Sequence, residues 1–236
     1  MAVHEQGELA KDSASRLMQE PSEAGIYLYW LPLGAGGSYV KLNGRIFEFI
    51  QAQLERRLPL DLYHTALKVR VPEGLFVVEN SWPIPNADGP SRGVVVEGPV
   101  FSRRVRRLSA LRYEVRLWRD GVIADVAEAV ASPQWVSQDP EQARLLLQLA
   151  SYVPPLVWGR DEEATGDMWN SNSVISYLLA RSGVPTDGIE PPDGGRAPGW
   201  HAGLELARRA GHSLEGAHAA LQDNDASHRQ TASTAV

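Results

Sequence analysis

The sequence contains no cysteine in its 236 residues. This absence excludes disulfides, thiolate zinc sites, iron–sulfur clusters and a thiol nucleophile. Long apolar runs are missing as well, since no stretch approaches the roughly 20 residues that span a bilayer. Residues 1–12 carry acidic side chains where a signal peptide needs a basic start and an apolar stretch. We therefore expect a cytoplasmic protein with no membrane span and no cofactor, whose chemistry uses oxygen and nitrogen atoms.

Positive charge is in short supply, because 23 Lys and Arg residues face 29 Asp and Glu residues and leave a net charge of −6. A nucleic-acid binder needs a basic surface that displaces counterions from phosphates, so this balance argues against a nucleic-acid partner. One local exception is the basic run of Arg103, Arg104, Arg106 and Arg107. A phosphate, an anionic lipid surface and plain solvent are all open as its surroundings, and solvent is favoured.

At this length one domain can bury a substantial core, and no flexible linker divides the apolar segments. Residues 1–22 and 211–236 are polar, which predicts two flexible tails around a single domain at 23–210. Residue patterns predict strands at 25–33, 62–71, 75–80, 93–96, 110–118 and 204–207, and helices at 45–57, 122–131, 139–152 and 170–181. This order favours an α+β fold in which helices pack on an antiparallel sheet.

The strand at 110–118 has the most regular pattern of the set. Its apolar residues alternate with Arg112, Glu114 and Arg116. Such a period of two is typical of a strand with one face on the core and the other in water. We therefore expect these three charged side chains to be exposed.

The candidate site combines a histidine with a polar helix start. His64 and His201 are the two histidines of the predicted domain, which leaves few choices for a catalytic base. His64 alone proves little, because a histidine within a strand is more often structural. The segment that opens the helix at 170–181 changes this assessment, because it crowds polar side chains against an apolar helix: Trp169, Asn170, Ser171, Asn172 and Ser173.

Helical spacing distinguishes the two serines of this segment. Ser171 precedes apolar residues by three, four and seven positions, so its side chain should lie along the buried stripe. Ser173 aligns with Ser176 instead and should lie away from the core. Helix capping accounts for one Asn or Ser, and not for all of them. A hydroxyl in the first turn gains the helix dipole and nearby N–H groups, here those of Ser171 and Asn172, which can stabilise an oxyanion.

The pattern Asn170-Ser171-Asn172 at the start of an apolar helix, with a strand histidine far upstream, resembles the circularly permuted papain-like peptidases and amidases, which are related to the NlpC-type peptidases. The resemblance covers about residues 62–183. It implies a papain-like fold, with His64 as general base and Ser171 where the family has a cysteine. That replacement is the main departure, because a serine hydroxyl is far less acidic than a thiol and needs the base during attack.

The family often uses a third polar group to orient the imidazole, and Glu79 and Asn80 are the candidates here. The turn between the two strands decides which of them shares the side of His64. A three-residue loop of Pro72, Glu73 and Gly74 selects Asn80, whereas a two-residue loop of Glu73 and Gly74 selects Glu79. We favour Glu79, because a carboxylate also stabilises the imidazolium.

Three further features carry weaker hypotheses. Trp169 either lines a pocket beside Ser171 or anchors the packing of the helix. The acidic run at 158–163 lacks the spacing of a metal site, so solvent exposure is favoured. Residues 199–201 either close the cleft or form a surface turn.

Two functions follow from these observations. The first is a hydrolase or acyltransferase that acts on an amide or ester of a small-molecule, peptide or lipid-like acyl substrate, with His64 as base, Ser171 as nucleophile and Glu79 as orienting group. The second is a catalytically inactive papain-like domain that binds a ligand or protein. In both, the binding residues expected around the site are Asn80, Trp169, Asn170, Asn172 and Ser173.

Overall fold

The structure is a computed structural model, and it describes residues 21–33, 61–81, 93–100, 102–105, 111–123 and 126–211. The predicted helix at 45–57 and almost all of the two predicted tails lie outside the described residues. No helix in the described ranges is both long enough and apolar enough to cross a bilayer.

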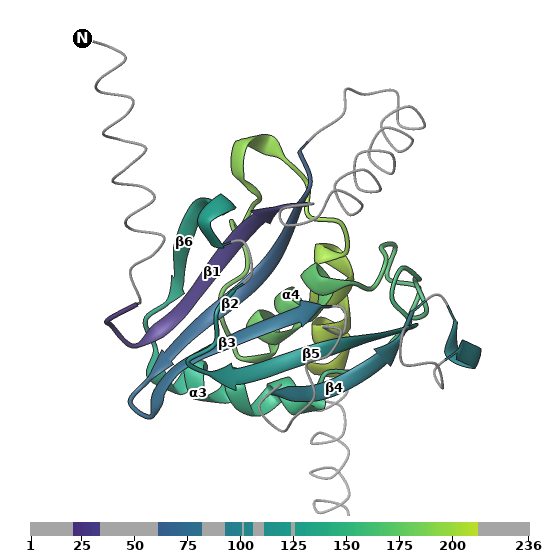
Figure 1. The fold of residues 1–236 in the computed structure, drawn as a ribbon. Helices are drawn as coiled ribbons and strands as arrows, with labels where there is room; N and C mark the ends of the chain where they lie inside the picture. The colour runs from purple at the N-terminus through teal and green to yellow at the C-terminus, as the bar shows by residue number, and fades with distance from the viewer. Residues whose placement is uncertain are drawn as a thin grey trace, which may run out of the picture.

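Within the described residues, six strands form one antiparallel sheet in the order β4-β5-β3-β2-β1-β6 (Figure 1). The strands are β1 (Gly25–Pro32), β2 (Tyr63–Val71), β3 (Gly74–Ser81), β4 (Val94–Pro99), β5 (Arg112–Arg119) and β6 (Val130–Ser137). The first five match predicted strands. The sheet together with its helices confirms the predicted α+β class.

The hairpin of β2 and β3 turns at Pro72 and Glu73, because Val71 pairs directly with Gly74. Both predicted loops were wrong about the turn residues, since Gly74 already belongs to the ladder. The pairing ends at Leu67 and Val78. Beyond that point β2 continues along β1, and β3 continues along β5.

Two predicted helices are confirmed with their start signals. Helix α3 (Pro140–Leu149) has Pro140 in its first turn, and its N-cap Asp139 accepts a hydrogen bond from the Glu141 N–H at 2.8 Å. A short 3-10 helix, η5 (Ala150–Tyr152), follows it. Helix α4 (Ser171–Arg181) begins after the N-cap Asn170. Two further 3-10 helices are η2 (Arg103–Val105) and η6 (Pro192–Gly194).

Two predicted elements were wrong. Of the region 122–131, the structure describes all but residues 124 and 125, and the described part holds the 3-10 helix η4 (Val126–Glu128) and the start of β6 in place of an α-helix. Strand β6 contains Pro133, which lacks an N–H and is tolerated because β6 lies at the edge of the sheet. Residues 204–207 are part of a helix at 200–211 and not a strand. Glu205 binds Arg208 and Arg209 there, three and four residues on, which is helical spacing.

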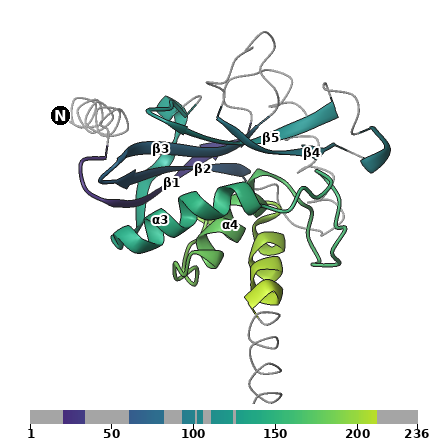
Figure 2. The same cartoon turned by 90° about the horizontal axis from the view of Figure 1, so that it is seen from below.

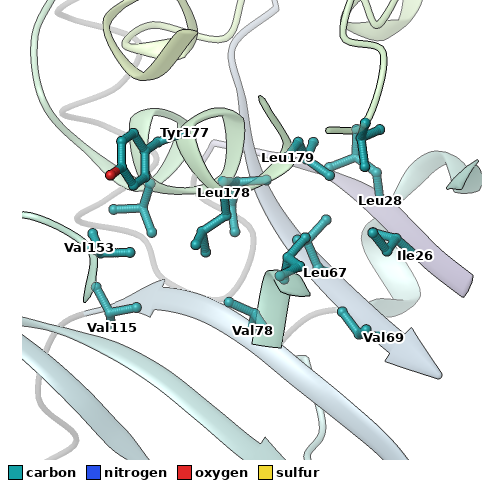
Figure 3. Packing of buried hydrophobic residues seen from close by; sticks show 14 of the residues in the cluster. Ile26, Leu28, Leu67, Val69, Val78, Val115, Val153, Tyr177, Leu178 and Leu179 are labelled. Atoms are coloured by element: carbon teal, nitrogen blue, oxygen red, sulfur yellow. The ribbon is translucent and has the colours of Figure 1, made fainter. Parts of the chain in front are cut away.

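Helices α3, α4 and 200–211 all lie on one face of the sheet, here called the helix face (Figure 2). Side chains of α4 such as Leu178 and Leu179 meet Leu28, Leu67 and Val78 from the strands (Figure 3). The opposite side of the sheet, here called the far face, has a smaller apolar cluster of Tyr27, Tyr29, Leu31, Ala66, Val77, Ile123 and Ala129. Each strand in the middle of the sheet is therefore buried on both faces.

Candidate functional site

The start of α4 is a complete capping box. The Asn170 Oδ1 accepts hydrogen bonds from the N–H groups of Asn172 at 2.9 Å and Ser173 at 3.4 Å, and the Ser173 hydroxyl accepts one from the Asn170 N–H at 3.0 Å. The Asn170 Nδ2 donates to the Pro198 carbonyl at 2.8 Å. The polar atoms of Asn170 therefore serve the helix start and a distant loop.

Asn172 connects α4 to the sheet. Its Nδ2 donates to the carbonyls of Tyr63 and Pro198, both at 2.9 Å, and its Oδ1 accepts a hydrogen bond from the Thr65 hydroxyl at 3.0 Å. The side chain is 1% exposed. Asn172 therefore joins three parts of the chain, namely β2, α4 and the segment before the last helix.

Ser173 and Ser176 bind the same segment from the other side of α4. The Ser173 hydroxyl lies 2.7 Å from the Gly199 carbonyl and 3.0 Å from the Met168 carbonyl, and the Ser176 hydroxyl donates to the Trp200 carbonyl at 2.8 Å. The prediction that Ser173 lies away from the core was wrong, since it is fully buried. Helix 200–211 packs on that side of α4. The spacing of apolar residues along α4 alone could not predict this contact, because it comes from another helix.

These side chains form a structural unit that we call the α4 latch, composed of Asn170, Asn172, Ser173 and Ser176 with their partners at Tyr63, Thr65 and residues 198–200. Gly199 permits the close contact, because it has a φ of +86° and a side chain there would collide with the Asn170 carboxamide. The latch accounts for the excess of polar residues that made this segment a candidate site. It ties together segments that are far apart in the sequence.

Ser171 is buried and stands outside the latch. Its place on α4 is in the stripe of Val174, Ile175 and Leu178, which belongs to the core on the helix face. Within the described part of the chain, no hydrogen bond engages its hydroxyl. Of the two N–H groups predicted to stabilise an oxyanion, that of Asn172 donates to the Asn170 carboxamide.

The structure does not bring His64 and Ser171 together on one face of the sheet. His64 pairs with Leu31, and both Leu31 and Ala66 belong to the cluster on the far face. The next residue, Thr65, binds Asn172 of α4 on the helix face. Because side chains alternate along a strand, His64 lies on the far face and α4 lies on the other.

Glu79 shares the far face with His64. Leu67 pairs with Val78, so the side chains of these two residues lie on the same face of the sheet. Because side chains alternate along a strand, residues 64, 66 and 79 all lie on the opposite face. On β5, the partner of Glu79 is Arg116. The Arg116 Nη1 lies 3.7 Å from the Glu79 Oε1, while its Nε and Nη2 both donate to the Glu114 Oε2 at 2.9 and 2.7 Å. Burial lowers the pKa of the Arg116 guanidinium, and the Glu79 carboxylate opposes that shift.

The charged network on the far face was missed at the sequence level. Glu114 is 2% exposed and Arg116 is 3% exposed, so the prediction of a half-exposed strand was wrong for both. The alternation of apolar and charged residues along β5 is the same whether the face with the charged residues is exposed to solvent or buried. The sequence pattern therefore could not distinguish the two cases. Lys68 is also buried on this face, with its ammonium 5.6 Å from the centre of the Tyr29 ring.

Asn80 lies on the helix face, opposite to Glu79. It pairs with Val115, a member of the core on that face, and it is 6% exposed. Both its Oδ1 and its Nδ2 are buried, and neither has a hydrogen-bond partner among the described residues. Buried carboxamides are nearly always paired, so this side chain calls for a specific explanation.

Trp169 anchors the packing in front of α4. It is buried, its ring meets Tyr177 edge-on at 6.5 Å, and its Nε1 donates to the Tyr113 hydroxyl at 3.1 Å. That hydroxyl in turn donates to the Leu156 carbonyl at 2.9 Å. Trp169 therefore joins the helix start to β5 and to the segment after η5.

We expect Tyr113→Phe to lower the free energy of unfolding by about 2 kcal/mol, because it leaves the Leu156 carbonyl and the Trp169 N–H unpaired in the core. Chemical denaturation measures this change. Tyr152→Phe is the matched control, since Tyr152 is exposed and should change stability by less than about 0.5 kcal/mol. Equal effects of the two variants would contradict the anchoring role.

The acidic loop before α4 is held by internal contacts. Glu162 accepts hydrogen bonds from Arg103 at 2.8 and 3.1 Å and from the Val157 N–H at 2.8 Å, and these contacts lower the pKa of its carboxyl group. Arg103 of the basic run is thereby paired, while Arg104 is exposed and Arg106 and Arg107 lie outside the described residues. Among the described residues, no group of three His, Asp or Glu side chains could hold a metal ion.

Residues 199–201 lie where a turn at Gly199 leads into the helix at 200–211. Gly199 and Trp200 belong to the latch through their carbonyls, and His201 is exposed. Comparison of the chain with protein-family models, curated proteins and solved structures found no match.

Proposed function

We propose that this chain is a binding module built on a permuted papain-like arrangement, in which Ser171 acts as a buried polar contact and not as a nucleophile. The order of a histidine-bearing strand before a helix opened by Asn170-Ser171-Asn172 supports the arrangement. The antiparallel sheet with helices on one face agrees with it. The binding role is the second of the two functions that the sequence suggests.

The α4 latch is the observation that carries this proposal. Acyl transfer needs a first turn whose N–H groups and hydroxyl are free to meet a substrate. Here the Asn170 Oδ1 accepts hydrogen bonds from the N–H groups of Asn172 and Ser173. The Asn172 carboxamide is hydrogen-bonded to β2 and to the Pro198 carbonyl. The first turn is therefore organised to hold the fold together.

The position of the base supports the same conclusion. A serine hydroxyl gives up its proton only to a base within hydrogen-bonding reach, directly or through one water. Strand alternation puts His64 on the far face, whereas Ser171 belongs to the helix face. The His64 imidazole and the Ser171 hydroxyl therefore lie on opposite faces of the sheet, whereas activation of the nucleophile requires both on the same face.

We expect no Ser171-dependent adduct when the full chain is treated with a fluorophosphonate or an activated ester, because His64, the expected base, lies on the face of the sheet opposite to α4. Intact-mass spectrometry of the wild-type chain, Ser171→Ala and His64→Ala measures the adduct, with a serine protease as the positive control. An adduct on the wild-type chain that disappears in both variants would overturn the binding role and restore the hydrolase.

A further inference from the structure

We propose that Asn80 is the recognition group for a ligand that presents a primary carboxamide at the first turn of α4. This inference rests on the proposed binding function and names the ligand class for it. It is carried by the burial of the unpaired Asn80 side chain and by the parting of two strands beside it.

The hydrogen-bonding capacity of the Asn80 carboxamide is not satisfied by the described residues. In the part of the chain that the structure describes, its Nδ2 and Oδ1 are both buried without a hydrogen-bond partner, and the residue is 6% exposed. A buried polar group without a partner destabilises the folded state, because it gives up its hydrogen bonds to water and gains none. A residue that serves packing alone would be apolar, as its neighbours Val78 and Val115 on the same face are.

The sheet opens beside this residue. The ladder of β2 and β3 ends at Leu67 and Val78, and Thr65 and Asn80 follow two residues further along each strand. Figure 1 shows the two strands diverging at this end, where β2 stays with β1 and β3 stays with β5. Thr65 binds Asn172, so the end of β2 at this opening lies under the first turn of α4, and β3 packs against the same helix.

Ser171 adds a second polar group at this place. It is buried on the side of α4 that packs on the sheet, and its hydroxyl makes no hydrogen bond within the described residues. Of the polar side chains that open α4, it alone is left out of the latch. The described residues thus offer two unpaired groups on the helix face, the carboxamide of Asn80 and the hydroxyl of Ser171.

The chemistry of these groups selects a neutral ligand. A carboxamide offers one donor side and one acceptor side, and another primary carboxamide satisfies both through two parallel hydrogen bonds. A carboxylate would place a negative oxygen against the Asn80 Oδ1. The first turn of α4 contains no charged residue, and its dipole end is already met by Asn170.

The test uses propionamide as the probe and propionate as its isosteric control, titrated into the full chain and followed by ligand-observed NMR. We expect propionamide to bind and propionate to bind at least tenfold more weakly, since the acid lacks the N–H groups that pair with the Asn80 Oδ1. Asn80→Asp should weaken propionamide binding about tenfold or more, and Ser171→Ala should weaken it less. Gly211→Ala, which changes a site with open space around it, should leave binding unchanged.

A second variant separates recognition from folding. Asn80→Leu removes the unpaired carboxamide, so it should raise the midpoint of thermal unfolding while it abolishes propionamide binding. Equal binding of the amide and the acid, binding that survives Asn80→Asp and Asn80→Leu, or no binding at all would overturn the carboxamide site. These outcomes would leave the binding module standing, which only the Ser171-dependent adduct described above overturns.

Discussion

Asn172→Ala should lower the free energy of unfolding by about 3 kcal/mol, since it removes three hydrogen bonds and takes this partner from the buried Tyr63 carbonyl and Thr65 hydroxyl, while the Pro198 carbonyl keeps only its bond from Asn170. The partners are the Tyr63 and Pro198 carbonyls and the Thr65 hydroxyl. Urea denaturation of the full chain, followed by circular dichroism, measures the change.

The neighbouring variant Ser171→Ala is the matched control for this result. Its hydroxyl makes no hydrogen bond within the described part of the chain, so its loss should change stability by less than about 1 kcal/mol. If both variants destabilise the protein equally, Asn172 does not act through its hydrogen bonds. If neither does, the latch contributes little to stability.

Gly203→Val should be at least as damaging, with a loss of about 3 kcal/mol or more, because the new side chain has no room against α4. A Cβ at this position would overlap the Ser173 carbonyl and the Ser176 hydroxyl and come within 2.8 Å of the Tyr177 N. Two of these three atoms belong to the backbone of α4, which cannot turn aside as a side chain can. The helices would therefore have to move apart, and Asn172 and Ser176 would lose their contacts with residues 198–200.

Gly211→Ala tests the same type of change without the overlap. Gly211 lies in the same helix, and a Cβ there would meet nothing within 4 Å. We expect this variant to match the wild type in thermal unfolding or to exceed it slightly, because alanine favours the helix. A Gly203→Val variant as stable as Gly211→Ala would contradict the close packing of the two helices.

The two sets of expected results separate the structural from the recognition role of the polar residues around α4. Loss of a latch residue should lower stability, whereas loss of the Asn80 carboxamide should raise it and abolish ligand binding. This difference in sign follows from pairing, because Asn172 is fully bonded and Asn80 is not. Both are buried asparagines, so the comparison holds side-chain chemistry constant.

Local patterns predicted much of the fold. The hairpin of β2 and β3, the position of strand β5, the capping of α3 by Asp139 and that of α4 by Asn170 each depend on residues close in sequence, and each was found. Strand β6 was missed because its edge position tolerates Pro133, which argues against a strand in the middle of a sheet. The helix at 200–211 was misread because four residues with apolar alternation fit a strand as well as a helix turn.

By itself, the sequence determined the approximate positions of strands β1 to β5 and of helices α3 and α4, the residues that cap those two helices, and the polar cluster that opens α4. Only the tertiary structure decided which face of the sheet each side chain meets. In the folded chain, the far face carries His64, Glu79, Glu114 and Arg116, and the helix face carries Thr65, Asn80 and Ser171. The physical reason is that periodicity records which residues share a side of one element, whereas the neighbour covering that side comes from another part of the chain.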